Sequence, residues 1–170
     1  MLNELDSLNK PLIGKINGSS FGGAIGLISC CDFAISVEDA EFSLTEVLLG
    51  LIPSTISPFV IRRIGAANAR RIMLNAHRFS AKEAVRLGLV AKAVPSKSLE
   101  GEIEKEITDL LLCAPEAVSV TKKLISEVNG KDPQIIRDYT IEKLADAWET
   151  ETVKEGIDAF LSKRRPGWSR

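Results

Sequence analysis

Residues 17–31, NGSSFGGAIGLISCC, constrain the fold of this 170-residue chain more than any other stretch. The apolar residues 12–16 come directly before it, and a run of small and apolar residues follows two adjacent glycines, so it is predicted to join a buried strand to a helix. Gly22 and Gly23 let the backbone approach a ligand closely. The free amides at such a helix start suit an anion or an oxyanion, although small residues at such a turn more often mark close packing.

The flanking pattern predicts an α/β fold. Residues 12–16 are predicted as a strand, residues 23–31 as a helix and residues 32–36 as the next strand. A strand, a helix and a strand within about 25 residues form a crossover unit with parallel strands. Further along, residues 58–75 have helical spacing interrupted by a glycine, and residues 80–83 have the form of a capping box that begins a second, short helix.

Glu46 is the one carboxylate in the apolar run TEVLLGLIP at residues 45–53. A glutamate in this setting can be an exposed loop residue or a charge at a helix start. It can also be a side chain that donates or accepts a proton in a site. The segment by itself leaves both interpretations open.

After Pro95 the pattern changes to successive amphipathic helices. Helices with apolar stripes and little sheet to cover pack on one another or on a neighbouring subunit, which favours an oligomer. We therefore predict a core at residues 1–95 and a helical oligomerisation region at residues 96–170. The four stripes are Ile103, Ile107, Leu110 and Leu111; Ala117, Val120, Leu124 and Val128; Ile141, Leu144, Ala145 and Trp148; and Val153, Ile157, Phe160 and Leu161.

Composition narrows the classes of function. The hydrophobic fraction is 45% and the net charge is −1, so the chain can bury a core and has no basic field for nucleic acid. The single histidine and three cysteines, of which Cys30 and Cys31 are adjacent and Cys113 is distant, form neither a metal site nor a disulfide framework. Since no apolar run approaches the roughly 18 residues of a membrane span, we expect no membrane partner and a cytoplasmic location.

Four segments together resemble the enoyl-CoA hydratase/isomerase (crotonase) family. They are NKPLIGKINGSSFGGAIGLISCCDFAIS, EFSLTEVLLGLIPSTISPFVIRRIG, HRFSAKEAVRLGLVAKAV and EGIDAFLSKRRPGW, and the resemblance covers essentially all of the chain. The motifs FGGAxGLISCCD and LIPxxISP are most similar to those of bacterial methylglutaconyl-CoA hydratases of leucine breakdown and of the related hydratases of branched isoprenoid acids. The resemblance implies a crotonase-like ββα spiral core, acyl-CoA thioester substrates and usually a homotrimer or hexamer.

The resemblance also implies a site. Gly23 would supply one of two oxyanion amides, and Glu46 matches one of the two glutamates of typical hydratases. The other glutamate falls on Gly26, so the chain lacks that carboxylate. Coenzyme A enters as part of the substrate, so no separate cofactor and no metal are expected. Phe160 and Lys163 match residues that reach the coenzyme A of a neighbouring subunit, although a helix stripe and a helix C-terminal charge would explain them equally well.

The implied reaction is the addition of water to an α,β-unsaturated acyl-CoA similar to methylglutaconyl-CoA. Alternatives are Δ3-Δ2 enoyl-CoA isomerisation by Glu46 alone and an inactive crotonase-fold scaffold. RNA binding is expected least, because the chain is nearly neutral. Family members carry, before the position of Leu12, a segment that supplies the second oxyanion amide. We therefore expect residues 1–170 by themselves to be a fragment, a late start or a truncated product with little activity.

Overall fold

The computed structural model describes residues 1–169, which form two compact units. The first unit contains Met1–Leu8 and Leu12–Lys105, and the second contains Asn9–Pro11 and the chain from Glu106 onward. These units are defined by compactness, whereas the boundary predicted after residue 95 separates a core from an oligomerisation region, so that boundary stays a prediction.

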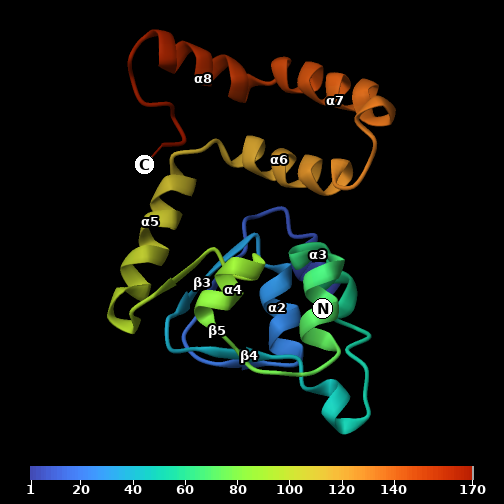
Figure 1. Ribbon diagram of the computed structural model, residues 1–170. Coiled ribbons are helices and arrows are strands. Elements are labelled where there is room, and N and C mark those ends of the chain that lie inside the picture. The colour runs from blue at the N-terminus through green and yellow to red at the C-terminus, as the bar shows by residue number, and fades with distance from the viewer. Residues whose placement is uncertain (170) are drawn as a thin grey trace. The chain divides into compact units, whose positions relative to one another are not determined.

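The first unit contains a parallel sheet that the sequence predicts. Helix α1 (Leu2–Asp6) precedes β1 (Ile13–Ile16), α2 (Gly23–Cys30) and β3 (Phe33–Val37). Strands β1 and β3 are parallel neighbours, and β6 (Lys92–Val94) extends the sheet in the order β1-β3-β6. Gly14 lies opposite Ala34, where a Cβ on Gly14 would come within 2.9 Å of the Ala34 Cβ. The predicted strand-helix-strand unit is therefore confirmed (Figure 1).

A second small sheet was not predicted. It contains β2 (Ser20–Phe21), β4 (Glu41–Ser43) and β5 (Phe79–Ser80) in the order β2-β4-β5. β2 lies inside the stretch interpreted as a turn, because two residues are too short to carry a strand pattern. With β2 present, β1, β2 and α2 form one ββα repeat, and β3, β4 and α3 (Ser57–Met73) form the next.

The remaining elements of the first unit cover this core. A short 3-10 helix, η1 (Glu46–Leu49), leads to α3, which packs against α2. Helix α4 (Ala81–Leu87) begins at the predicted cap, where the Glu83 amide donates to the Ser80 hydroxyl oxygen at 3.3 Å. Gly65, at φ 77° and ψ 156°, interrupts α3 as its sequence suggests. Fully buried residues at the centre are Ile25, Ala34, Ile35, Phe42, Val60, Ala84 and Leu89.

The second unit is helical. It contains α6 (Pro115–Val128), α7 (Pro133–Trp148) and α8 (Glu151–Leu161). Helix α5 (Leu99–Leu111) follows the 3-10 helix η2 (Ser96–Ser98), and its first residues belong to the first unit and its last residues to the second. Helices α6 and α7 run in opposite directions and are joined by a tight connection (Figure 1). The predicted stripe on α7 is largely uncovered, since Ile141, Leu144 and Trp148 are more than half exposed. Within residues 1–169, no helix has the length and apolar character that crossing a membrane requires.

Candidate functional site

The first part of the site is the turn formed by Gly22 and Gly23, called here the glycine turn. Strand β2 runs directly into Gly22, which is the N-cap of α2 and has φ 53° and ψ −122°, a conformation that favours glycine. The Gly22 amide donates to the Ser43 carbonyl oxygen at 2.9 Å, which fixes the turn against β4. The next amide, on exposed Gly23, has no acceptor among residues 1–169. A free amide at a helix start is therefore available to a ligand.

Glu46 lies beside this turn. It is the first residue of η1, three residues after the end of β4. A Cβ on Gly22 would lie 3.4 Å from the Glu46 Oε1, so the glycine leaves room for the carboxylate. The Glu46 Oε2 is buried and has no hydrogen-bond partner among the described residues. The structure thus brings together Glu46 and the glycine turn, which lie more than twenty residues apart in sequence.

This arrangement suits the chemistry of a carbonyl compound. A free helix-start amide stabilises negative charge that develops on an oxygen, and the dipole of α2 adds to that effect. A neighbouring carboxylate can move a proton to or from an adjacent carbon. Both groups belong to the first unit, and β4 positions both of them.

The apolar run around Glu46 does not fold over it. Leu48 and Leu49 are 70% and 73% exposed, and Leu51 and Ile52 are also largely exposed. Gly50 ends η1 in the left-handed region, at φ 71°, and turns the chain toward α3. These side chains therefore form an exposed apolar loop next to the site.

Gly26 lies one turn into α2 and is buried against Ile56. A Cβ on Gly26 would lie 2.3 Å from the Ile56 Cγ2 and 2.8 Å from the Ile56 Cβ. The position implied for the absent glutamate is therefore filled by the N-cap residue of α3. Sequence reasoning missed Ile56, because the segment STISP at residues 54–58 gives no sign of which side chain faces α2.

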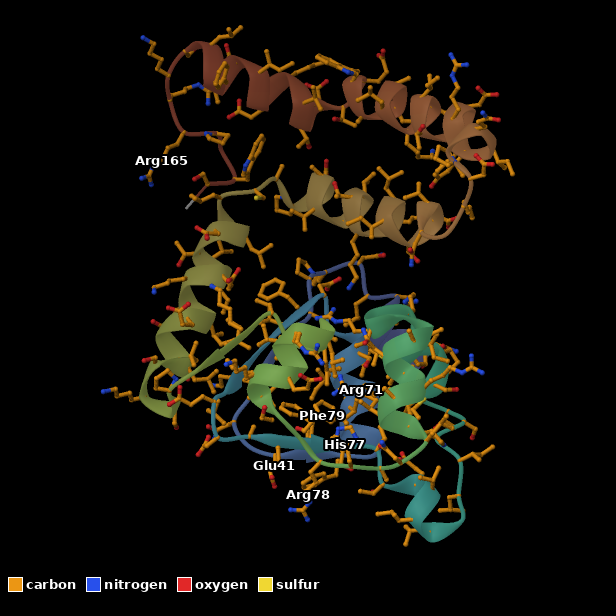
Figure 2. All side chains as sticks on the ribbon, in the orientation of Figure 1. Glu41, Arg71, His77, Arg78, Phe79 and Arg165 are labelled. Carbon is orange, nitrogen blue, oxygen red and sulfur yellow. The ribbon has the colours of Figure 1, made fainter. Side chains whose placement is uncertain are left out.

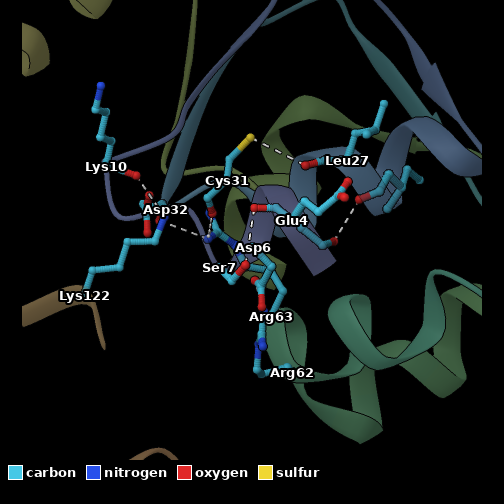
Figure 3. Close-up of polar contacts among 12 residues, drawn as sticks. Glu4, Asp6, Ser7, Lys10, Leu27, Cys31, Asp32, Arg62, Arg63 and Lys122 are labelled. Atoms are coloured by element: carbon cyan, nitrogen blue, oxygen red, sulfur yellow. Dashed lines mark hydrogen bonds and ion pairs between the residues drawn. The ribbon is translucent and has the colours of Figure 1, made fainter. Parts of the chain in front are cut away.

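An arginine side chain supports the C-terminal end of α2. At this end, Arg63 donates to the carbonyl oxygens of Cys31 and Asp32 at 2.8 and 3.1 Å (Figure 3). It also donates to the Gly88 carbonyl oxygen at 3.0 Å. Burial lowers the pKa of Arg63, and the nearby Cys31 and Asp32 oppose that shift. A guanidinium at a helix C-terminus also complements the helix dipole. Arg63 thereby fixes the end of α2 opposite to the glycine turn.

At the other end, Arg78 contacts Phe21, the residue that precedes the glycine turn. The Arg78 guanidinium lies 5.4 Å from the centre of the half-exposed Phe21 ring and forms an ion pair with Glu41 at 3.1 Å. Figure 2 shows Arg78 and Glu41 at the same edge of the unit. The neighbouring His77 bonds through Nδ1 to the Asn75 side chain at 2.8 Å, as a residue near a helix end would.

Phe160 and Lys163 lie in the second unit, at the end of α8. The Phe160 ring is 81% exposed, and Lys163 follows the helix with φ 52°, in the left-handed region. Both side chains are exposed and close in sequence, which is compatible with binding one ligand. Glu46 lies in the other unit, so the structure does not bring Phe160 and Lys163 together with it.

The comparisons with known proteins agree with these features. A family model described as enoyl-CoA hydratase/isomerase matches residues 1–170. The chain belongs to this family. The predicted family and its α/β crotonase fold are therefore confirmed. One relative is a crotonyl-CoA hydratase of Syntrophomonas wolfei, which is 35% identical to this chain over 166 residues. The alignment covers 95% of this chain and 62% of that protein.

Two solved structures show the same fold. An enoyl-CoA hydratase from Shewanella pealeana superposes with a TM-score of 0.93 at 40% identity, covering 98% of this chain and 63% of that one. AtuE from Pseudomonas aeruginosa superposes with a TM-score of 0.94 at 37% identity, covering 99% of this chain and 66% of that one. The chain thus spans somewhat less than two thirds of the length of these family members.

Proposed function

We propose that the protein adds water to an α,β-unsaturated acyl-CoA thioester. The observation that carries this proposal is the Glu46 carboxylate. Its Oε1 lies at the Gly22 turn, which precedes the free Gly23 amide, and its Oε2 is buried without a hydrogen-bond partner among residues 1–169. A buried carboxylate oxygen without a partner costs stability, so its retention favours a role toward a ligand. Family membership supports the acyl-CoA class of substrate.

One carboxylate suffices to balance the reaction. The oxygen of water bonds to the β-carbon while the π electrons move through the α-carbon onto the thioester oxygen, where the Gly23 amide stabilises the enolate. Glu46 accepts the proton that water releases. It then returns a proton to the α-carbon as the thioester carbonyl re-forms. The net change is one water added across the double bond.

The substrate proposed in finer detail is a methylglutaconyl-CoA-like thioester. The sequence motifs FGGAxGLISCCD and LIPxxISP support this finer proposal. The similarity to a crotonyl-CoA hydratase supports hydration in general. Phe160 and Lys163 are proposed to hold the coenzyme A portion through ring stacking and phosphate charge. A homotrimer or hexamer in the cytoplasm is proposed as well, and the exposed apolar side chains of α7 support subunit contacts.

Isomerisation of a Δ3-enoyl-CoA to its Δ2 form is the second candidate. The contact of Ile56 with Gly26 favours it, because an apolar group occupies the place where a second carboxylate would assist water. Glu46 would then remove a proton from one carbon of the acyl chain and return it two carbons away. No water would be added.

The two candidates are separated by their products. The protein, expressed from its whole gene, is incubated with 3-methylglutaconyl-CoA, crotonyl-CoA and a 3-enoyl-CoA. The products are separated by liquid chromatography, which distinguishes isomers of equal mass, and their masses are measured by mass spectrometry. Hydration predicts a gain of one water from either of the first two thioesters. Turnover of the 3-enoyl-CoA to an isomer of equal mass, with no reaction of the other two, would replace hydration by isomerisation. No turnover of any of them would favour an inactive scaffold.

A further inference from the structure

Lys163 occupies a backbone conformation that its residue type disfavours. After α8 ends, the Lys163 amide donates to the Phe160 carbonyl oxygen at 3.2 Å and the Arg164 amide donates to the Ala159 carbonyl oxygen at 3.0 Å. These two bonds define a Schellman C-cap with Lys163 at the left-handed position, where glycine is usual. A lysine retained there needs a compensating contact or a use for its side chain.

The compensating contacts come from Arg164, the next residue. Its guanidinium donates two hydrogen bonds to the Glu155 carboxylate, at 2.7 and 2.8 Å, and also contacts Asp158. The Glu155 Oε1 accepts a third bond from the Gly167 amide at 2.8 Å. The Arg164 bonds and the Gly167 amide lower the pKa of Glu155 to about 2. Glu155 therefore ties both ends of the segment 164–167 to α8.

Trp168 completes the attachment. Its ring lies over Gly156, where a Cβ would come within 3.2 Å of the Trp168 Cη2. Its indole N–H donates to the Leu112 carbonyl oxygen at 3.3 Å. We call the contacts of Glu155, Gly156 and Leu112 with Arg164, Gly167 and Trp168 the C-terminal clasp. All of them lie within the second unit.

The side chains of Phe160, Lys163 and Arg165 are not part of the clasp. Lys163 forms no ion pair within residues 1–169, and the Phe160 ring is exposed. The Arg165 side chain also points outward from the segment (Figure 2). One exposed aromatic ring and two cations thus lie within residues 160–165, a set that suits an aromatic ligand that carries phosphates.

We propose that Glu155 is a positioning residue for coenzyme A, because through Arg164 and Gly167 it holds Lys163 in the left-handed conformation, three residues after the exposed Phe160. This inference rests on the proposed function, in which Phe160 and Lys163 hold the coenzyme A portion of the substrate. Glu155 itself does not touch the ligand.

The test is the affinity for coenzyme A of a Glu155→Gln variant, measured by calorimetry. Removal of a carboxylate near a phosphate site would by charge alone tighten binding. Loss of the clasp predicts the opposite, a weakening of about fivefold to tenfold. The effect is expected to shrink to less than about twofold in a Lys163→Gln background, because the two residues act through one contact. The matched control is Glu151→Gln on the same helix, where only an exposed pair with Lys154 is lost and no change is expected.

Trp168 fluorescence, measured in a Trp148→Phe background, reports the clasp separately, and Glu155→Gln is expected to shift its emission to longer wavelength. A shifted emission with unchanged or tighter coenzyme A binding would overturn the proposal, and so would an unshifted emission. If the weakening occurs but the protein converts no enoyl-CoA, the clasp stands and the proposed reaction fails. Absence of coenzyme A binding by the unaltered protein would overturn both.

Discussion

The Ile56 side chain fills the space that any side chain at position 26 would need. A Cβ added to Gly26 would lie 2.3 Å from the Ile56 Cγ2 and 3.7 Å from the Ile56 Cα. The packing of α2 against α3 thus leaves no room at position 26 for a side chain unless Ile56 moves.

Gly26→Glu is therefore expected to lower the free energy of unfolding by at least about 1–3 kcal/mol, through overpacking and burial of a charge. Gly26→Glu with Ile56→Ala is expected to lose less than the sum of the two single changes, because the alanine removes the clashing atoms. Urea denaturation measures each value. Gly101→Glu is the control, because Gly101 is exposed on α5 and no atom lies within 4 Å of its added Cβ. Equal losses for Gly26 and Gly101 would contradict the packing argument.

Lys163→Gly is expected to raise the free energy of unfolding by about 0.5–1 kcal/mol, because glycine adopts the left-handed conformation without steric cost. Lys163→Ala keeps the Cβ and should give no such gain. Thermal denaturation of the two variants compares them directly. A stabilisation shared by both would point to the lysine charge instead of the backbone.

The lowered pKa values of Glu83 and Glu155 predict that the protein loses stability in acid. The pKa of Glu83, bonded to Arg86 and Arg71, and that of Glu155, bonded to Arg164, are each lowered to about 2 from an ordinary 4.5. Since the folded state holds these protons less tightly than the unfolded state, their contribution is complete above pH 4.5 and is lost as the pH falls toward 2. The melting temperature should therefore fall over this interval. Glu83→Gln and Glu155→Gln should each flatten the fall, and a profile unchanged in both variants would contradict the assignment.

Arg63→Ala is expected to destabilise the fold by about 1–3 kcal/mol, because three carbonyl oxygens lose their donor. Arg63→Lys should recover only part of this loss, since one ammonium cannot match the planar guanidinium fork. Arg62→Ala is the control, because Arg62 is exposed and forms a surface pair with Asp6. Chemical denaturation of the three variants checks the order. A loss for Arg62→Ala as large as that for Arg63→Ala would contradict the anchoring role.

Local rules in the sequence predict much of the first unit. The N-cap at Ser80, the break at Gly65 and the helix start at Gly23 each depend on residues close in the chain, and each occurs as expected. The other half of the capping box is not seen, because the Glu83 carboxylate bonds Arg71 and Arg86. The two-residue strand β2 is too short to carry a periodic pattern, so its pairing with β4 could not be predicted.

In the site too, local motifs could be predicted from the sequence, but contacts that depend on tertiary structure could not. Glu46 and Gly23 can be proposed from residue type and motif, but their proximity depends on β4, which joins the turn and η1 through tertiary contacts. Ile56 gives no signal, because its role is set by the helix that it faces. Similarly, the clasp at Glu155 brings together residues nine to twelve positions apart through a chain reversal that no local pattern specifies.

The most direct test of the central claim is the rate at which the protein converts crotonyl-CoA, compared between the unaltered protein and Glu46→Gln. The expected result for the unaltered protein is a product heavier by one water. Glu46→Gln should be slower by about 10²–10⁴-fold while its melting temperature is unchanged or higher, because the substitution keeps the side-chain shape at a buried position and removes only the carboxylate that transfers the proton. Equal rates for the two proteins would contradict the account.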